Sequence, residues 1–241
     1  MCRTTSRIGF SVCQLCSLAL TSVIMLASIA SAQDAAKGKG KSLFDGKSLT
    51  GWSGISELWR VEDGAITGET KADAPLKNNT FLVYQNPVKD FELTCEFKIT
   101  GGNSGIQYRS KLIDKDKFIV GGYQADIDSQ KRYMGINYEE RGRGILAERG
   151  DIVAIDESGK KSKVGSAGDV DALTGRFNVD DWNSYRIVAK GTVCQHYING
   201  TLMSEIQDGQ PDKRSAEGIL AFQLHQGPPM KVQFKNIMLV E

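Results

Sequence analysis

The strict alternation of apolar and polar residues from Phe91 to Ile99 is the feature that most constrains the fold of this chain. Apolar side chains occupy every second position of this run (FELTCEFKI), so that one face can pack on a core while the other faces outward. Similar runs meet at tight-turn signals, such as Asp63-Gly64 and Asn199-Gly200, which favour hairpins. No long apolar period of 3.6 residues is present, which predicts few and short helices. Short strands joined by glycine-rich turns predict an all-β sandwich or barrel.

The N-terminal residues have the pattern of a secretory signal peptide. Arg3 and Arg7 precede an apolar stretch, and Ala30-Ser31-Ala32 is a small-residue cleavage site. We expect three parts in chain order: a signal peptide at 1–32, a flexible linker at 33–42 and a single domain at 43–241. A single membrane anchor is the alternative. The first interpretation predicts an exported protein, periplasmic or secreted, with no membrane attachment after cleavage.

Charge and cysteine content bear on the partners and the compartment. The formal net charge is +1, and removal of residues 1–32, which hold two arginines and no acidic residue, changes it to −1. A nearly neutral chain without a basic stripe argues against a nucleic-acid partner. After cleavage only Cys95 and Cys194 remain. They form one disulfide or two small buried side chains, and their strand-like surroundings favour burial.

A glycine-rich block at 101–110 (GGNSGIQYRS) lies between two strand-like runs and marks the candidate site. The strands around it carry polar residues on their outward faces, and neighbouring strands are expected to bring these side chains to one surface. The residues expected to share this surface are Glu96, Gln107, Arg109, Gln124 and Asp126. A polar lining of this kind is typical of a sugar-binding site.

Motifs spread over the domain resemble a known family. They lie at 43–52 (LFDGKSLTGW), 59–66 (WRVEDGAI), 90–93, 102–109 (GNSGIQYR), 122–127 (GYQADI), 199–200 and 232–237. On these segments the chain resembles the 3-keto-disaccharide hydrolase domain family. The resemblance implies a concanavalin A-like, laminarinase-like jelly-roll sandwich with a concave polar face, and a carbohydrate as the partner. The chain departs from the common pattern at 139–149 and at 228–230, which bears on the substrate more than on the fold.

The resemblance implies hydrolysis of 3-keto-glycosides. The ketone acidifies the hydrogen at C2, so that loss of this proton expels the group at C1, and water then adds. Such a site needs a base, a donor or cation for the enolate oxygen, and an acid for the leaving oxygen. The catalytic candidates are His225, Asp126, Glu96 and Arg109. The candidates for substrate binding are Asn103, Gln107, Tyr123, Gln124 and Gln223.

A divalent metal is a further candidate for stabilising the enolate. Asp126 and Asp128 alternate onto one face and can bind a hard cation through oxygen, unless they form an ordinary solvated face. His225 is alternatively a structural histidine after a strand end, and Arg109 is alternatively paired with Glu96 or Asp126. His196 alternates with apolar residues, which predicts a packed, hydrogen-bonded side chain.

Two other functions remain open at the level of sequence. A jelly roll can be a non-catalytic carbohydrate-binding module, because a fold does not determine a function. A retaining glycosidase of the laminarinase type needs two closely spaced carboxylates, and its Glu-x-Asp-x-x-Glu strand is absent from this chain. The ionisable candidates therefore favour the 3-keto-glycoside hydrolase, with the binding module as the alternative.

Overall fold

The structure is a computed structural model that describes residues 40–241. The expected signal peptide at 1–32 and the linker as far as residue 39 lie outside the described residues. The last two linker positions, Lys41–Ser42, form the short strand β1, which pairs with the C-terminal strand of the chain. Among the described residues, no helix is both long enough and apolar enough to span a membrane.

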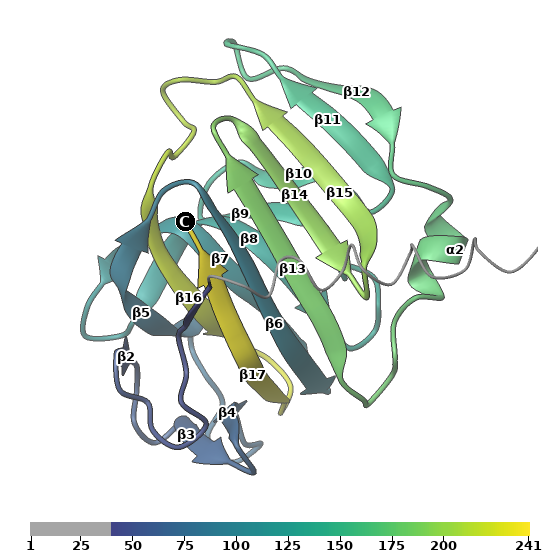
Figure 1. Cartoon of the computed structure of the whole chain (residues 1–241). Coiled ribbons are helices and arrows are strands. Elements are labelled where there is room, and N and C mark those ends of the chain that lie inside the picture. Colours follow the sequence, from purple (N-terminus) through teal and green to yellow (C-terminus); the bar gives the residue numbers. More distant parts are fainter. Residues whose placement is uncertain (1–39) are drawn as a thin grey trace, which may run out of the picture. The chain divides into compact units, whose positions relative to one another are not determined.

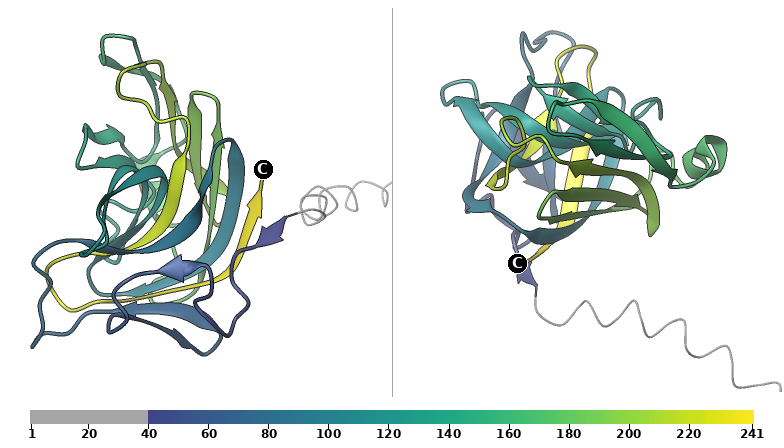
Figure 2. Two further views of the ribbon diagram at one scale, coloured as in Figure 1. Left: turned by 90° about the vertical axis from the view of Figure 1, so that its left-hand side faces the viewer. Right: turned by 90° about the horizontal axis from the view of Figure 1, so that it is seen from above.

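The described residues form two β-sheets, seen one behind the other in Figure 1 and edge-on at the left of Figure 2. The ten-stranded sheet runs in the order β12 (Lys161–Ser166), β11 (Asp151–Ile155), β15 (Thr201–Asp208), β14 (Val193–Ile198), β13 (Asn183–Lys190), β6 (Phe91–Thr100), β17 (Lys231–Val240), β4 (Ala65–Glu69) and β3 (Trp59–Glu62), with β1 beside β17. The seven-stranded sheet runs in the order β10 (Gly144–Ala147), β9 (Asn137–Glu140), β8 (Ile119–Asp128), β7 (Asn103–Asp114), β16 (Gly218–Leu224), β5 (Thr80–Val88) and β2 (Trp52–Ser53).

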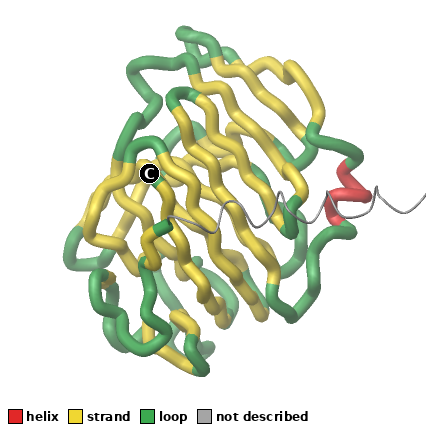
Figure 3. Tube along the Cα trace, in the orientation of Figure 1, coloured by secondary structure: helices red, strands yellow, loops and turns green. Residues whose placement is uncertain are grey.

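Most neighbouring strands are antiparallel, and the pair β11 and β15 is parallel. The single described helix, α2 (Val170–Thr174), lies at one edge of the sandwich (Figure 3). This architecture confirms the predicted all-β sandwich with few and short helices.

The core lies between the two sheets and consists of the inward-facing half of each alternating strand. In β6, the inward residues are buried and the intervening ones are partly exposed, as the sequence alternation predicts. Phe222 of β16 stacks on Phe234 of β17 across the core, with ring centroids 3.9 Å apart. Burial of such aromatic surface stabilises the contact between the sheets.

Three predictions about buried residues can be compared with this core. Cys95 and Cys194 are both free thiols and both buried, in agreement with the second alternative for them. Burial raises the pKa of the Cys194 thiol to about 11, which makes it a packing group and a poor nucleophile. His196 is buried, with Nδ1 bonded to the Ile136 carbonyl and Nε2 2.9 Å from the Tyr108 hydroxyl. This confirms His196 as a packed, hydrogen-bonded histidine.

The outer face of the seven-stranded sheet is polar because of the same alternation. In β7, β8 and β16, apolar residues such as Ile106, Ala125 and Phe222 point into the core. The residues between them, including Gln124 and Gln223, point to the opposite face. The fold thereby places a row of amide and carboxyl side chains on one surface.

Candidate functional site

A pocket of about 1000 Å³ lies on the polar face of the seven-stranded sheet. Its floor comes from β7, β8, β9 and β16, and its rim comes from the segments at 129–133 and 225–229. The residues that line it are Asn79, Gly101, Gly102, Asn103, Gln124, Asp126, Asp128, Ser129, Gln130, Arg132, Tyr133, Ile136, Tyr138, Glu140, Ile145, Gln223, His225, Gln226, Pro228 and Pro229. Its volume is at the upper end of the range for small-ligand pockets.

The glycine-rich block shapes one side of this pocket. Gly101 and Gly102 have φ angles of 67° and 62°, which side chains disfavour, and they form the turn between β6 and β7. A Cβ on Gly102 would lie 2.8 Å from the Met230 side chain, so the segment that carries Pro228 and Pro229 packs closely on this turn. The turn and the proline segment therefore form one wall of the pocket.

Asp126 is fixed on the floor by a relay of three polar side chains. Ser110 donates to Gln107 Oε1 at 2.6 Å, Gln107 Nε2 donates to Gln124 Oε1 at 2.6 Å, and Gln124 Nε2 donates to Asp126 Oδ1 at 2.5 Å. Gly105 makes room for this arrangement, because a Cβ there would lie 2.5 Å from Gln124 Cδ. The relay holds one carboxylate oxygen and leaves the other without a protein partner among the described residues.

Two carboxyl groups of the pocket have raised pKa values. Burial raises the pKa of Asp126 well above its usual range; the Gln124 hydrogen bond opposes this, and the neighbouring Glu140 and Asp128 add to it. Burial also raises the pKa of Glu140, against the hydrogen bond from Asn79 and the charges of Arg141 and His225. Raised carboxyl pKa values in a cleft are typical of proton-transfer sites.

His225 follows the end of β16, on the same side of the pocket as Glu140 and Asn79. Its Nδ1 donates to the Gln226 carbonyl, which leaves Nε2 for a ligand. Asn79 connects this segment to the acid: Nδ2 lies 3.2 Å from Glu140 Oε1, and Oδ1 accepts the Gln226 amide at 2.9 Å. The histidine is thus placed beside Glu140 by a defined hydrogen-bond bridge.

Gln223 is the side chain of the pocket whose polar atoms lack partners. It is fully buried, and neither its amide oxygen nor its amide nitrogen has a hydrogen-bond partner in the protein. A buried amide in this state costs free energy, so a partner inside the pocket is expected. Gln223 thus leaves one donor and one acceptor unpaired at the floor of the pocket that it lines.

The structure therefore brings together six of the predicted residues in one pocket. They are Asn103, Gln124, Asp126, Asp128, Gln223 and His225. Gln107 pairs with Gln124 across β7 and β8 and donates to its side-chain oxygen. The predicted clustering of polar residues on this face is correct for these positions.

The placement of Glu96 on the same surface is wrong. Glu96 belongs to β6 in the other sheet and accepts a hydrogen bond from Asn236 Nδ2 at 2.7 Å. Glu96 Oε2 lies 3.4 Å from Lys235 Nζ, on the partly exposed outer face of the ten-stranded sheet. The sequence alternation correctly turned Glu96 outward, but it could not show that β6 and β7 separate into different sheets.

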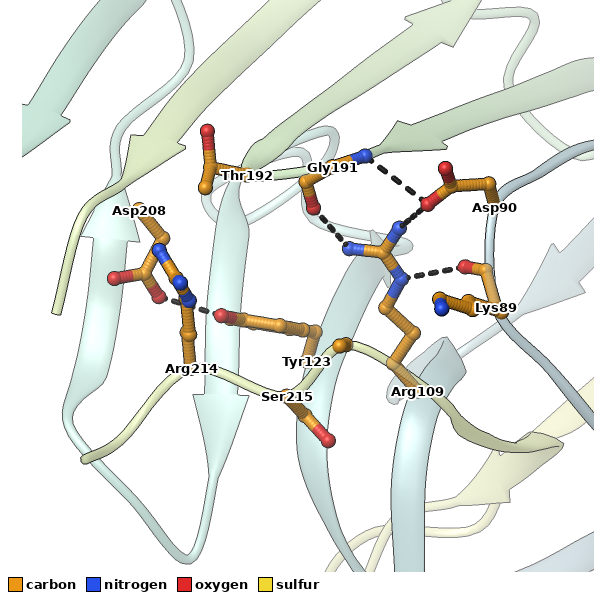
Figure 4. A pocket seen from close by; sticks show the side chains of 10 residues that line it. Lys89, Asp90, Arg109, Tyr123, Gly191, Thr192, Asp208, Arg214 and Ser215 are labelled. Atoms are coloured by element: carbon orange, nitrogen blue, oxygen red, sulfur yellow. Dashed lines mark hydrogen bonds and ion pairs between the residues drawn. The ribbon is translucent and has the colours of Figure 1, made fainter. Parts of the chain in front are cut away.

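The expectation for Arg109 and Tyr123 is also wrong in position, because they line a separate pocket of about 190 Å³ (Figure 4). Arg109 is buried and donates to the carbonyls of Lys89 and Gly191 and to Asp90. Its φ of 46° marks an irregularity in β7 that reverses the expected alternation.

Tyr123 packs on Tyr108, and its hydroxyl donates to Asp208 at 2.5 Å. The polar groups of Arg109 and Tyr123 are therefore already satisfied within the protein. These interactions give both residues structural roles, and they leave no exposed polar atom of either residue to recognise a substrate in the larger pocket.

The carboxylates of the pocket do not form a metal cage. Both Asp128 oxygens accept backbone amides, those of Gln130 and Tyr133, at 3.0 and 2.9 Å. Among residues 40–241, no group of three or more His, Cys, Asp or Glu side chains has an arrangement that could hold a metal ion. This donor set does not fit a divalent ion.

Several residues of the pocket were not predicted from the sequence, notably Glu140, Tyr138, Asn79, Arg132 and Tyr133. Tyr138 and Glu140 lie on β9, where Gln124 pairs with Tyr138 and Gly122 pairs with Glu140. The alternation of Tyr138 and Glu140 was a usable signal for a short strand. The pairing of that strand with β8 was not visible in the sequence.

Solved structures share this fold. A candidate glycosyl hydrolase from Parabacteroides distasonis has a TM-score of 0.55 and 22% identity, over 86% of this chain and 95% of that chain. The carbohydrate-binding module CBM66 from Bacillus subtilis has a TM-score of 0.51 and 16% identity, over 79% and 96% of the two chains. A protein of unknown function with a galectin-like fold from Bacillus subtilis has a TM-score of 0.52 and 11% identity, over 79% and 89%. At these identities the likeness shows the jelly-roll fold.

No curated protein is similar enough in sequence to count as a relative. The family comparison is decisive in contrast, because residues 39–240 match the 3-keto-α-glucoside-1,2-lyase-like domain. This range contains both sheets and the whole pocket, and it confirms the resemblance found in the sequence motifs. The chain therefore belongs to the family of the 3-keto-α-glucoside-1,2-lyase-like domain.

Proposed function

We propose that the protein is an exported enzyme that cleaves 3-keto-glycosides in the pocket of about 1000 Å³. The observation that carries the proposal is the set of ionisable groups in this pocket. Asp126 and Glu140 have raised pKa values, and His225 stands beside Glu140. Family membership supports the chemistry, and the unpaired amide of Gln223 supports a ligand rich in oxygen atoms.

The proposed reaction is an elimination followed by hydration. Asp126, as the carboxylate, takes the proton at C2, and the electron pair of the C2–H bond forms a C1=C2 double bond. The C1–O bond breaks, and the leaving oxygen receives a proton. Water then adds across the double bond, with hydroxyl at C1 and a proton at C2. The net result is hydrolysis, and no oxidant or reductant is consumed.

Each role is assigned to a residue whose surroundings suit it. Asp126 has one oxygen held by Gln124, and a raised pKa makes its carboxylate a stronger base. His225 Nε2, which has no partner among the described residues while Nδ1 donates to the Gln226 carbonyl, would deliver a proton to the leaving oxygen. The Gln223 amide N–H would stabilise the enolate oxygen, which is a preorganised role of the oxyanion-hole type.

The proposal is tested by incubating the purified protein with a 3-keto-disaccharide and measuring the free sugar. We expect turnover by the wild type, loss of turnover in Asp126→Asn and His225→Ala, and full turnover in Glu96→Gln. The last variant is a matched control, because it removes a carboxylate from the opposite sheet. EDTA should leave the rate unchanged.

Absence of release by the wild type from several 3-keto substrates would contradict the enzyme proposal. If the same protein then bound unoxidised glycans, the non-catalytic carbohydrate-binding module would be the better account. The two outcomes are separable, because binding can be measured by calorimetry on the same samples.

A further inference from the structure

The rim segment at 129–135 carries an exposed aromatic ring on a loop that several hydrogen bonds anchor. Tyr133 lines the pocket with 42% of its surface exposed, although it is a large aromatic residue. The segment follows β8 directly, so the ring stands at the edge of the floor that holds Asp126. An exposed aromatic ring at the rim of a polar pocket is a feature that binding sites often use.

Asp128 anchors this loop from within. Its two carboxylate oxygens accept the backbone amides of Gln130 and Tyr133, at 3.0 and 2.9 Å, and its carbonyl accepts the amide of Lys131 at 3.0 Å. Lys131 itself has a φ of 66°, as the sharp turn requires. Asp128, which the sequence suggested as a metal ligand, therefore fixes the backbone on which Tyr133 stands.

Arg149 and the glycine turn anchor the same loop from outside. Arg149 is half-buried, and its Nη1 donates to the carbonyls of Lys131 and Met134 at 2.7 and 2.9 Å. Ser129 donates through its hydroxyl to the Gly102 carbonyl at 2.8 Å. A loop that is held on three sides cannot easily withdraw its aromatic ring, so the ring is preorganised at the rim.

The Tyr133 ring is also held by a cation. The Arg132 guanidinium carbon lies 5.2 Å from the ring centroid, and Arg132 is only loosely paired with Glu148, at 3.7 Å. Tyr133 lines the pocket and keeps 42% of its surface exposed. The pocket thus has two regions of different chemistry: a floor of carboxyl and amide groups, and a rim with one flat aromatic surface.

We propose that Tyr133 forms a stacking subsite for the leaving group, so that the preferred substrates carry a ring on both sides of the scissile bond. This inference rests on the proposed function, because the floor is assigned to the 3-keto ring. Sugar rings and phenolic rings both offer a flat face to tyrosine. Asp128 is the positioning residue of this subsite, and it touches no reacting atom.

The test compares a 3-keto-disaccharide, an aryl 3-keto-glycoside and a methyl 3-keto-glycoside in the wild type, Tyr133→Ala and Tyr133→Phe. We expect kcat/KM of Tyr133→Ala to fall roughly tenfold for the two substrates with a ring-bearing leaving group. It should stay within about twofold of wild type for the methyl glycoside. Tyr133→Phe should restore the wild-type values, and comparison of the two ring-bearing substrates shows which leaving group is preferred. An equal loss for all three substrates would overturn the proposal.

Asp128→Ala tests the positioning role. This variant should lose the same preference for a ring-bearing leaving group. The double variant Asp128→Ala/Tyr133→Ala should show no larger fall in kcat/KM for the ring-bearing substrates than either single variant, because both changes remove the same subsite. Additive losses would contradict the positioning role. Circular dichroism of each variant shows whether the fold is retained.

Failure of the proposed function has a different signature. If the wild type cleaves none of the three substrates, the enzyme proposal fails. The subsite is then tested by measuring the binding of unoxidised sugars. A stacking subsite then predicts that Tyr133→Ala weakens binding of an unoxidised disaccharide and not of the matching monosaccharide. Equal binding of the disaccharide by Tyr133→Ala and wild type would overturn the subsite itself.

Discussion

The side-chain amide of Gln124 makes two hydrogen bonds: its Oε1 accepts from Gln107 Nε2 at 2.6 Å, and its Nε2 donates to Asp126 Oδ1 at 2.5 Å. The oxygen of Gln124 accepts, so its nitrogen must face the carboxylate. This orientation supplies a hydrogen bond that favours the ionised form of Asp126 against the burial that disfavours it.

Replacing Gln124 by leucine should shift the pH dependence of the reaction. The variant removes the hydrogen bond that lowers the Asp126 pKa, so the pKa rises further and less of the carboxylate is ionised at neutral pH. We expect the acid limb of the kcat/KM profile to move to higher pH, with a rate near the wild-type value at the alkaline end. An unshifted limb would show that Asp126 is not the base.

Replacing Asp126 by asparagine should abolish activity and stabilise the fold at higher pH. Removal of a general base typically costs about 10²- to 10⁴-fold in rate. The raised folded-state pKa means that the native state holds a proton which the unfolded chain releases above the ordinary carboxyl pKa. Wild-type stability therefore falls as pH rises toward the folded pKa, and the asparagine variant escapes this loss. Melting temperatures of wild type and Asp126→Asn at acid and alkaline pH test this direction. An Asp126→Asn variant less stable than wild type at alkaline pH would contradict it.

His196 should make the fold sensitive to acid. Burial lowers the pKa of His196 to about 3, whereas the unfolded chain takes up a proton near the ordinary value of 6.5. Its contribution to stability is present above pH 6.5 and is lost as pH falls toward 3. The slope should approach about 1.4 kcal/mol per pH unit for this one proton. Urea unfolding between pH 7 and 4 measures it, and His196→Gln should have a correspondingly smaller slope.

Arg109 should matter for stability and not for turnover. Arg109→Met removes three hydrogen bonds and leaves the carbonyls of Lys89 and Gly191 without a donor, so we expect a loss of about 3 kcal/mol in unfolding free energy. The rate measured well below the melting temperature should remain near wild type. Lys89→Met is the matched control, since it removes a cation of the same small pocket and leaves the Lys89 carbonyl in place. Loss of turnover in an Arg109→Met variant that is still folded would contradict this prediction and indicate a catalytic role for Arg109.

The sequence predicted the fold well because alternation and turn chemistry are local signals. The run at β6, the Asn199-Gly200 hairpin and the glycine turn before β7 all formed as expected. The polar face of β8 and β16 followed from the same period of two. Gln124, Asp126 and Gln223 were therefore placed correctly on this face.

The parts that failed depend on non-local relations. Glu96 was grouped with Asp126 because the sequence does not reveal that β6 pairs with β13 and β17, and not with β7. The irregularity at Arg109 reversed its direction within β7. Glu140 and Tyr133 became neighbours of Asp126 only through the pairing of β9 with β8 and the loop between them. Strand pairing and local strand irregularities of this kind become visible only in the three-dimensional structure.

The most direct test of the central claim is the fate of the hydrogen at C2. Turnover of a 3-keto-disaccharide in D2O should give a product with deuterium at C2, because Asp126 removes the original proton and hydration supplies one from solvent. Early time points, with product incubated alone and with Asp126→Asn as controls, separate this label from spontaneous exchange. A product without deuterium at C2 would contradict hydration with a proton from solvent and would favour direct displacement at C1.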